Sequence, residues 1–267
     1  MTYQFAEING TKIHYDIQGE GTAVVLIHAG IVNLDMWQPQ MDAFSKRHRV
    51  LRYDMRGWGK TTCPDGTYSH HDDLHDLMKY VGMEEASLVG VSYGGKNALD
   101  FALTYPDKVQ KLILVGPGLG GYENWDGEGI ADKEEAMEAA YARGERTRSA
   151  ELDTQIWFDG PRRTPDQVDQ AIRREVYEMV LHTHSLPEDE GERLDIQPPA
   201  IERLAEVTAP TLLITGEEDA PDIHAIAQIL EQRVPDVRRK TMTGAAHLPS
   251  MENPAAFNQI VLSFLAD

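Results

Sequence analysis

Cysteine is almost absent from this chain: Cys63 is the single one among 267 residues. One cysteine excludes an internal disulfide and fits a reducing compartment. Long apolar runs are also lacking, since no stretch approaches the roughly 18 residues of a transmembrane helix. The first residues do not combine a basic region with an apolar run, so we expect no signal peptide and a cytoplasmic location.

Basic residues are scarce relative to acidic ones. There are 25 lysines and arginines against 44 aspartates and glutamates, which gives a formal net charge of −19. Nucleic acid and anionic membrane surfaces would repel such a chain, so we exclude both as partners. Apolar residues make up 41% of the sequence, which is enough for a substantial core. The length suits one α/β domain with an insertion.

Short apolar segments alternate along the chain with segments of helical periodicity. Asn9-Gly10, between two alternating runs, is typical of a β-hairpin turn. Strands separated by helices predict a mostly parallel sheet with helices on both faces, which is the α/β class. The predicted strands are residues 3–8, 12–17, 23–28, 48–53, 86–89, 111–115, 210–216 and 237–242.

The pattern changes over residues 117–206. An acidic run over residues 132–146 predicts one helix, and a second predicted helix begins with Thr164 as its N-cap. The apolar face of this second helix consists of Val168, Ile172, Val176, Met179 and Val180. We therefore predict a helical lid over residues 117–206, inserted into a core domain of residues 1–116 and 207–267.

Residues 90–95, Gly-Val-Ser-Tyr-Gly-Gly, place one serine where a predicted strand runs into a predicted helix. Such a serine, Ser92, lies on a sharp and strained turn that lifts its hydroxyl above the sheet edge. Gly90 and Gly94 remove side chains that would clash in that turn. The pattern indicates a nucleophile elbow if the chain also supplies a base, an acid and an oxyanion hole.

A candidate base and a candidate acid follow in the second half of the chain. His247 lies in a loop between a predicted strand and a C-terminal helix with Asn253 as its N-cap. Asp219 comes just after another predicted strand, with Glu218 and Asp222 as competing carboxylates. The order serine, aspartate, histidine is the order of the α/β-hydrolase triad.

The chain resembles the α/β-hydrolase fold family over nearly its whole length. The resemblance rests on five motifs in the order and spacing of the family. They are His28-Ala29-Gly30 after a strand, residues 54–59 (Asp-Met-Arg-Gly-Trp-Gly), the elbow at 90–95, residues 216–219 and residues 244–247. The resemblance implies an eight-stranded sheet with an inserted helical cap, and a catalytic triad of Ser92, His247 and Asp219.

The chemistry of such a triad follows from its residue types. A serine hydroxyl is a weak nucleophile at neutral pH and needs a base within hydrogen-bond reach. His247 can take the proton, while Asp219 would hold the other ring nitrogen and stabilise the imidazolium. The oxyanion needs preorganised donors, which we assign to the backbone N–H groups of Gly30 and Tyr93.

Other polar residues of these motifs are interpreted as structural. His28 would shape the oxyanion loop, and Asp54 and Arg56 would hold the loop beneath the elbow. Residues 70–75 contain an i, i+4 histidine pair that could grip a metal. The segment lacks the glutamate of an H-E-x-x-H motif, so we interpret it as a solvated helix start.

Two groups in the insertion have open interpretations. His182 and His184 end the second predicted helix, where positive charge is favoured, although one of them could face the pocket. Trp125, Trp157 and Phe158 either line a substrate pocket or form the small core of the lid.

The resemblance implies a serine hydrolase that cleaves a small carboxylic ester or lactone through an acyl-enzyme, with no metal or organic cofactor. A serine nucleophile argues against relatives of the haloalkane dehalogenase and epoxide hydrolase type, whose chemistry needs a carboxylate at that position. Ile31 stands where perhydrolases usually carry proline, which disfavours that activity. A carbon–carbon bond hydrolase shares the triad and stays open as an alternative, as does a ligand receptor built on the same fold.

Overall fold

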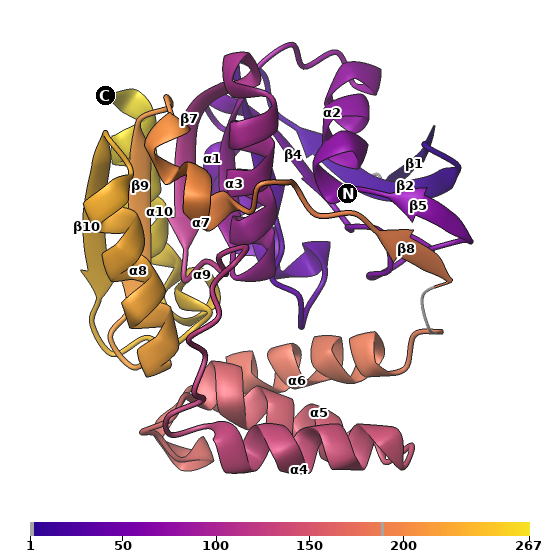
Figure 1. Cartoon of the computed structure of the whole chain (residues 1–267), viewed down its shortest axis with the longest axis vertical. Helices are drawn as coiled ribbons and strands as arrows, with labels where there is room; N and C mark the ends of the chain where they lie inside the picture. The colour runs from indigo at the N-terminus through magenta and orange to yellow at the C-terminus, as the bar shows by residue number, and fades with distance from the viewer. Residues whose placement is uncertain (1–2, 188–189) are drawn as a thin grey trace.

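The main element of the fold is an eight-stranded sheet (Figure 1). The computed structural model describes residues 3–187 and 190–267. In spatial order the strands are β1 (Gln4–Ile8), β2 (Thr11–Gln18), β4 (His48–Tyr53), β3 (Thr22–Ile27), β6 (Ala86–Val91), β7 (Val109–Val115), β9 (Thr211–Gly216) and β10 (Val237–Met242). The pairs β1–β2 and β2–β4 are antiparallel, and the pairs from β4 to β10 are parallel. The predicted α/β class with a mostly parallel sheet is therefore confirmed.

Local sequence signals account for several element bounds. The strands predicted over residues 48–53 and 237–242 are found with those bounds as β4 and β10. The predicted hairpin is confirmed, because Asn9 and Gly10 have φ values of 46° and 77°. Two consecutive left-handed residues match the twist of the flanking strands.

Helices cover both faces of the sheet (Figure 1). One face packs against α2 (His70–Tyr80), α3 (Tyr93–Thr104) and α8 (Pro221–Arg233). The other packs against α1 (Gln38–Phe44) and α10 (Pro254–Ala266). Successive β3 residues, Val24 and Val25, enter the two different clusters because side chains alternate across a strand. Burial on both faces explains why the central strands are almost continuously apolar.

Three helices form a separate layer at one end of the molecule (Figure 1). They are α4 (Ala131–Ala142), α5 (Arg146–Thr154) and α6 (Gln170–His184). The helix predicted over residues 132–146 is wrong in its extent, because the chain turns at Gly144 with a φ of 75° and α5 follows. We refer to these three helices as the helical insert.

The start of α6 also differs from the prediction. Thr164 caps only a short 3₁₀ turn, Pro165–Gln167, in a reciprocal capping box. The helix itself begins at Gln170, where the Asp169 carboxylate accepts from the N–H groups of Ala171 and Ile172. The predicted apolar face is confirmed further along, since Val176 and Val180 are fully buried.

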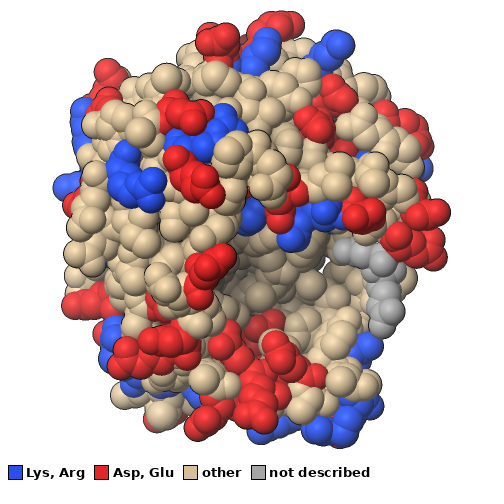
Figure 2. Space-filling view, viewed as in Figure 1, with Lys and Arg blue, Asp and Glu red and all other residues tan. Residues whose placement is uncertain are grey.

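The remaining elements are short. They are β5 (Gly66–Tyr68) and β8 (Gly191–Arg193), which pair in parallel, α7 (Ala200–Arg203), α9 (Pro249–Glu252), the π-helix Gln155–Asp159, and 3₁₀ turns at Leu34–Trp37, Pro106–Lys108 and Leu204–Glu206. None of the helices in residues 3–187 and 190–267 combines the length and the hydrophobicity needed to cross a bilayer. Figure 2 shows a hollow between the sheet-bearing part and the helical insert, with acidic side chains gathered below it.

Candidate active site

Ser92 occupies the turn between β6 and α3 in a strained backbone conformation. Its φ of 55° and ψ of −116° lie outside the regions that non-glycine residues favour. A Cβ on Gly90 would lie 2.3 Å from the carbonyl oxygen of Gly94, and one on Gly94 would lie 2.4 Å from that of Ile27. The predicted reason for glycine at these two positions is confirmed.

Gly30 and Tyr93, the two residues predicted to donate to an oxyanion, lie side by side. A Cβ on Gly30 would be 3.2 Å from the Cβ of Tyr93. Tyr93 is the first residue of α3, and the first N–H groups of a helix have no acceptor within the helix. Both N–H groups therefore come from the same corner of the sheet as Ser92.

Trp58 contacts both of these residues. Its indole N–H donates to the carbonyl oxygen of Gly30, and its ring lies 5.3 Å from the ring of Tyr93 between centroids. The motif containing Trp58 was recognisable in the sequence. The target of its N–H was not, because Gly30 lies on a different loop.

Asp219 and His247 form a buried pair. Nδ1 of His247 lies 3.0 Å from each carboxylate oxygen of Asp219, and the two residues are 2% and 1% exposed. Nε2 of His247 is buried and has no hydrogen-bond partner among the described residues. The carboxylate fixes the ring so that Nε2 is the nitrogen left available.

The competing carboxylates have other partners. Glu218 forms an ion pair with Arg162 (2.8 Å), and Asp222 accepts from the backbone N–H of Gly127 (3.0 Å). Of the three acids considered, Asp219 is the one that the structure brings to His247.

The last residue of β7, Val115, and the following Gly116 lie between Ser92 and the Asp219–His247 pair. The N–H of Ser92 donates to the carbonyl oxygen of Val115 (2.8 Å). A Cβ on Gly116 would lie 3.0 Å from Oδ2 of Asp219 and 3.2 Å from Nδ1 of His247. The serine turn and the buried pair thus flank the same short segment.

The three aromatic residues of the predicted lid have different environments. Trp157, on the π-helix, stacks at a tilt on His247 with 4.5 Å between centroids, and Trp125 lies 6.1 Å beyond it. Trp125 is 39% exposed. Phe158 is 1% exposed and belongs to a hydrophobic core cluster, which agrees with the second of the two interpretations.

His28, Asp54 and Arg56 have structural partners. Nε2 of His28 accepts from the backbone N–H of Met55 (3.0 Å), and burial lowers the pKa of His28, which favours its neutral form. Asp54 binds Nδ1 of His14 at 2.6 Å. Arg56 forms a buried ion pair with Asp73. These contacts hold the loops beneath the elbow, in agreement with the structural interpretation.

The histidines of residues 70–75 lie in different environments. His70 is buried, with its ring 5.8 Å from that of Trp58 and 5.5 Å from that of Tyr93. His75 stacks on Tyr105 instead. Within the part of the chain that the structure describes, no cluster of three or more histidine, cysteine or acidic residues could hold a metal ion. The solvated helix start is wrong for His70, whose burial follows from its aromatic neighbours.

The two histidines at the end of α6 also differ. His182 is exposed, with Nε2 3.3 Å from the carbonyl oxygen of Gly59. His184 is buried within the helical insert between Ser149 and Asp153.

Comparison with known proteins is consistent with this arrangement. The family profile described as alpha/beta hydrolase fold matches residues 22–254. A 2-hydroxy-6-oxononadienedioate/2-hydroxy-6-oxononatrienedioate hydrolase from Comamonas testosteroni is 29% identical, over 100% of this chain and 97% of its own. The carboxylesterase YbfK from Bacillus subtilis is 26% identical, over 95% of this chain and 84% of its own.

A solved structure has the same fold. The enol-lactonase from Burkholderia xenovorans LB400 superimposes with a TM-score of 0.77 at 24% sequence identity. The superposition covers 99% of this chain and 100% of that one.

Proposed function

The chain belongs to the alpha/beta hydrolase fold family, and on that premise we propose that it is a serine hydrolase of small carboxylic esters or lactones. Ser92 is the nucleophile, His247 the general base and Asp219 the residue that orients the base. A small-molecule substrate is the only partner that this chemistry requires, and the reaction needs neither a metal nor an organic cofactor.

The reaction proceeds in two half-reactions. Ser92 Oγ attacks the carbonyl carbon and gives its proton to Nε2 of His247, which then protonates the departing alkoxide oxygen. The backbone N–H groups of Gly30 and Tyr93 donate to the tetrahedral oxyanion. A water molecule, deprotonated by His247, attacks the resulting acyl-enzyme and releases the acid. A lactone follows the same steps, except that the freed hydroxyl stays tethered to the acyl chain, so that the second half-reaction releases a single hydroxy acid.

The observation that carries this proposal is the state of His247. Its ring is buried, Asp219 holds one nitrogen, and the other nitrogen has no partner in the described chain. Ser92, in its strained turn, binds the carbonyl oxygen of Val115, and the next residue, Gly116, borders the ring of His247. An unpaired buried nitrogen is costly in a protein interior, so its presence here supports a catalytic use.

The helical insert supports a role in substrate selection. We propose that residues 117–206 act as a cap over the core domain of residues 1–116 and 207–267. Trp157 and Trp125 would line the pocket beside His247, because their rings run from the imidazole toward the surface.

A second candidate activity is hydrolysis of a carbon–carbon bond. It is favoured by the 29% identity to the Comamonas testosteroni hydrolase. Such an enzyme would cleave a 2-hydroxy-6-oxo-dienoate with a kcat/KM well above that for any p-nitrophenyl ester.

The test is a substrate series with matched variants. Hydrolysis is measured for p-nitrophenyl esters of increasing acyl length, simple lactones and a 2-hydroxy-6-oxo-dienoate, with Ser92→Ala as the control. Intact-mass measurement after exposure to a p-nitrophenyl phosphonate reports whether Ser92 forms a covalent adduct. Ester or lactone turnover that disappears with Ser92→Ala supports the proposal. A kcat/KM for the dienoate well above that of every ester and lactone would replace it with the second candidate, and absence of any turnover or adduct in folded protein would overturn both.

A further inference from the structure

Arg163 joins the helical insert to the loop that precedes His247. Its Nε donates to the carbonyl oxygen of Asp159 (2.7 Å) and its Nη2 to that of Phe158 (2.6 Å), both at the end of the π-helix. Its Nη1 donates to the carbonyl oxygen of Gly244 (2.6 Å). All three nitrogens of one guanidinium are therefore engaged, and they hold two segments that are far apart in the sequence.

Glu252 of α9 holds the same loop from the other side. Its Oε2 pairs with Nη1 of Arg163 (2.8 Å), and its Oε1 accepts from the N–H of Ala246 (2.6 Å), the residue directly before His247. The side chains of Arg163 and Glu252 are only 13% and 10% exposed. A carboxylate this deeply buried depends on its arginine partner for charge compensation.

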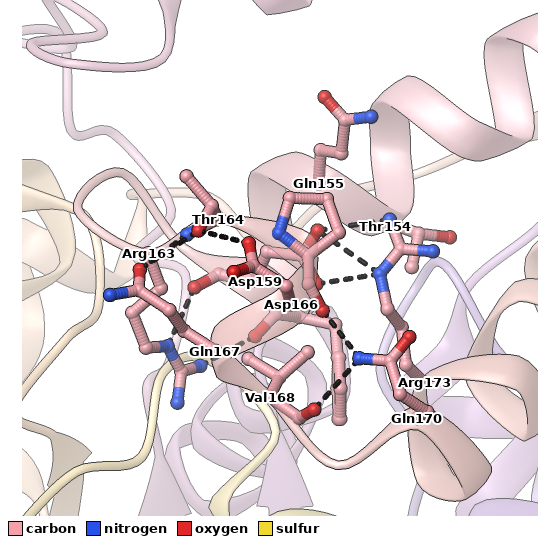
Figure 3. A network of polar contacts seen from close by, with 12 residues as sticks. Thr154, Gln155, Asp159, Arg163, Thr164, Asp166, Gln167, Val168, Gln170 and Arg173 are labelled. Atoms are coloured by element: carbon pink, nitrogen blue, oxygen red, sulfur yellow. Dashed lines mark hydrogen bonds and ion pairs between the residues drawn. The ribbon is translucent and has the colours of Figure 1, made fainter.

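The π-helix that Arg163 binds is also anchored inside the helical insert. The carboxylate of Asp159 is fully buried and pairs with Arg173 of α6 (2.9 Å), which also binds Glu151 (2.7 Å). Figure 3 shows Arg163 and Arg173 on opposite sides of Asp159. The same π-helix carries Trp157, whose ring packs on the imidazole of His247.

We infer that Arg163, balanced by Glu252, is a positioning residue that fixes the His247 loop and the Trp157-bearing π-helix in one relative placement. This inference rests on the proposed function, because it assigns the purpose of the contact to the reach of His247 toward Ser92. Arg163 touches neither Ser92 nor the Asp219–His247 pair in any contact described above. It acts through the peptide groups on either side of the imidazole.

The geometry of the contact predicts which substitutions disturb it. A lysine at position 163 keeps the charge for Glu252, but one ammonium group cannot reach carbonyl oxygens on both segments as a planar fork does. The double variant Arg163→Ala/Glu252→Gln removes the bridge and leaves no unpaired buried charge. Both variants are expected to fold, whereas Arg163→Ala alone leaves Glu252 uncompensated.

The experiment compares Arg163→Lys, Arg163→Ala/Glu252→Gln and Ser92→Ala with wild type on the best p-nitrophenyl ester. The control is Arg174→Ala, since Arg174 is a neighbouring arginine of the insert whose pair with Glu178 is exposed. For the proteins that keep Ser92, the kcat is calculated per site titrated with a p-nitrophenyl phosphonate, so that misfolded protein is excluded. For Ser92→Ala it is calculated per folded protein. The low-field proton resonance of the His247–Asp219 hydrogen bond is recorded for each variant.

For both Arg163 variants we expect kcat per titrated site to fall on the order of 10-fold to 10²-fold, because small misplacements of a catalytic group cost this much. KM should stay within about twofold, the low-field resonance should broaden or shift, and Arg174→Ala should match wild type. If both Arg163 variants keep wild-type kcat and resonance while Ser92→Ala is inactive, the inference is overturned and the triad stands. Full activity of Ser92→Ala would instead overturn the proposed function itself.

Discussion

Two groups of serine, histidine and aspartate among the described residues differ in how each histidine uses its ring nitrogens. The first consists of Ser92, His247 and Asp219 at the edge of the sheet. The second consists of Ser149, His184 and Asp153 between α5 and α6. Residue types alone do not separate them.

The two histidines use their ring nitrogens differently. In the helical insert, Nδ1 of His184 lies 2.8 Å from Oγ of Ser149, and Nε2 lies 3.0 Å from Asp153. Both nitrogens are therefore occupied. In the sheet-edge cluster, Asp219 takes Nδ1 of His247 and leaves Nε2 without a partner in the described chain.

The two serines differ in the same way. Ser149 is fully buried within α5, and its hydroxyl lies 3.1 Å from the carbonyl oxygen of Arg146, to which it can donate. Ser92 is partly exposed in a strained turn. A catalytic group needs an atom that is free to bind the substrate. His247 has such an atom in Nε2, whereas both ring nitrogens of His184 are occupied.

The largest expected contrast is between Ser92→Ala and Ser149→Ala. We expect Ser92→Ala to lower kcat by on the order of 10⁶ without loss of stability, because triad members act as one unit. Ser149→Ala should keep its turnover and lose about 1–3 kcal/mol of unfolding free energy, since it leaves a buried imidazole nitrogen unpaired. Ester kinetics and urea titration of both variants provide the measurement. Equal kinetic losses would show that the comparison is wrong.

The aspartates extend the contrast at a smaller scale. Asp219→Asn should lower kcat by about 10⁴, because the amide can select the wrong imidazole tautomer. Asp153→Asn should affect stability alone. The kcat of both variants is measured with one p-nitrophenyl ester at saturating concentration. Wild-type kcat in Asp219→Asn would mean that Glu218 or Asp222 supplies the acid.

A third buried histidine, His70, gives a contrast in the pH dependence of the unfolding free energy. Burial, followed by the charges of Arg193 and Lys96, lowers the pKa of His70 to about 3, while an unfolded chain has a value of about 6.5. Between these values the unfolded state binds a proton that the folded state does not. Stability therefore falls as the pH drops from about 6.5 toward 3, by up to about 1.4 kcal/mol per pH unit.

His70→Phe should keep the aromatic packing and reduce this loss on the acid side. The unfolding free energies of wild type and variant, measured between about pH 7 and pH 4, report the difference in slope. His184→Phe is the matched comparison. It leaves Ser149 and Asp153 without their imidazole partner, so it should be destabilised already at pH 7. An unchanged acid slope in His70→Phe would contradict the assignment of the proton to His70.

The smallest expected effect concerns the proposed oxyanion donors, Gly30 and Tyr93. Trp58→Phe keeps the ring against Tyr93 and removes the N–H that donates to Gly30. The loss of about 0.5–1.5 kcal/mol for one neutral hydrogen bond predicts up to about a tenfold fall in kcat at constant KM. Trp37→Phe is the control, because the indole N–H of Trp37 is buried without a described partner. A similar fall in both variants would remove Trp58 from the oxyanion site.

The sheet and the Asp219–His247 pair could be predicted from the sequence for a physical reason. Buried parallel strands are apolar runs bounded by turn residues, so β4 and β10 matched to the residue. Each candidate residue lies in the loop or turn that follows the carboxyl end of a strand, where the fold leaves little freedom of placement. The turn at Ser92 is likewise encoded by its neighbouring glycines.

The insert and its contacts could not be predicted in the same way. Residues 146–154 have no helical apolar stripe, and α5 is held by buried Ala150 and Leu152 against its neighbours. The role of Arg163 depends on carbonyl groups from two distant segments. The burial of Phe158 depends on which way the π-helix turns. Local sequence carries none of this information, because tertiary packing decides it.

The small parallel pair of β5 and β8 has a consequence for how the chain folds. Thr67 pairs with Glu192, so this contact closes a loop that contains β6, β7 and the whole helical insert. Closing so long a loop costs entropy before any contact repays it, and such pairings form slowly. We therefore expect β5 to pair with β8 late in folding, after the parallel strands of the main sheet have assembled. Refolding followed by hydrogen exchange would then protect Leu88 and Ile113 before Glu192.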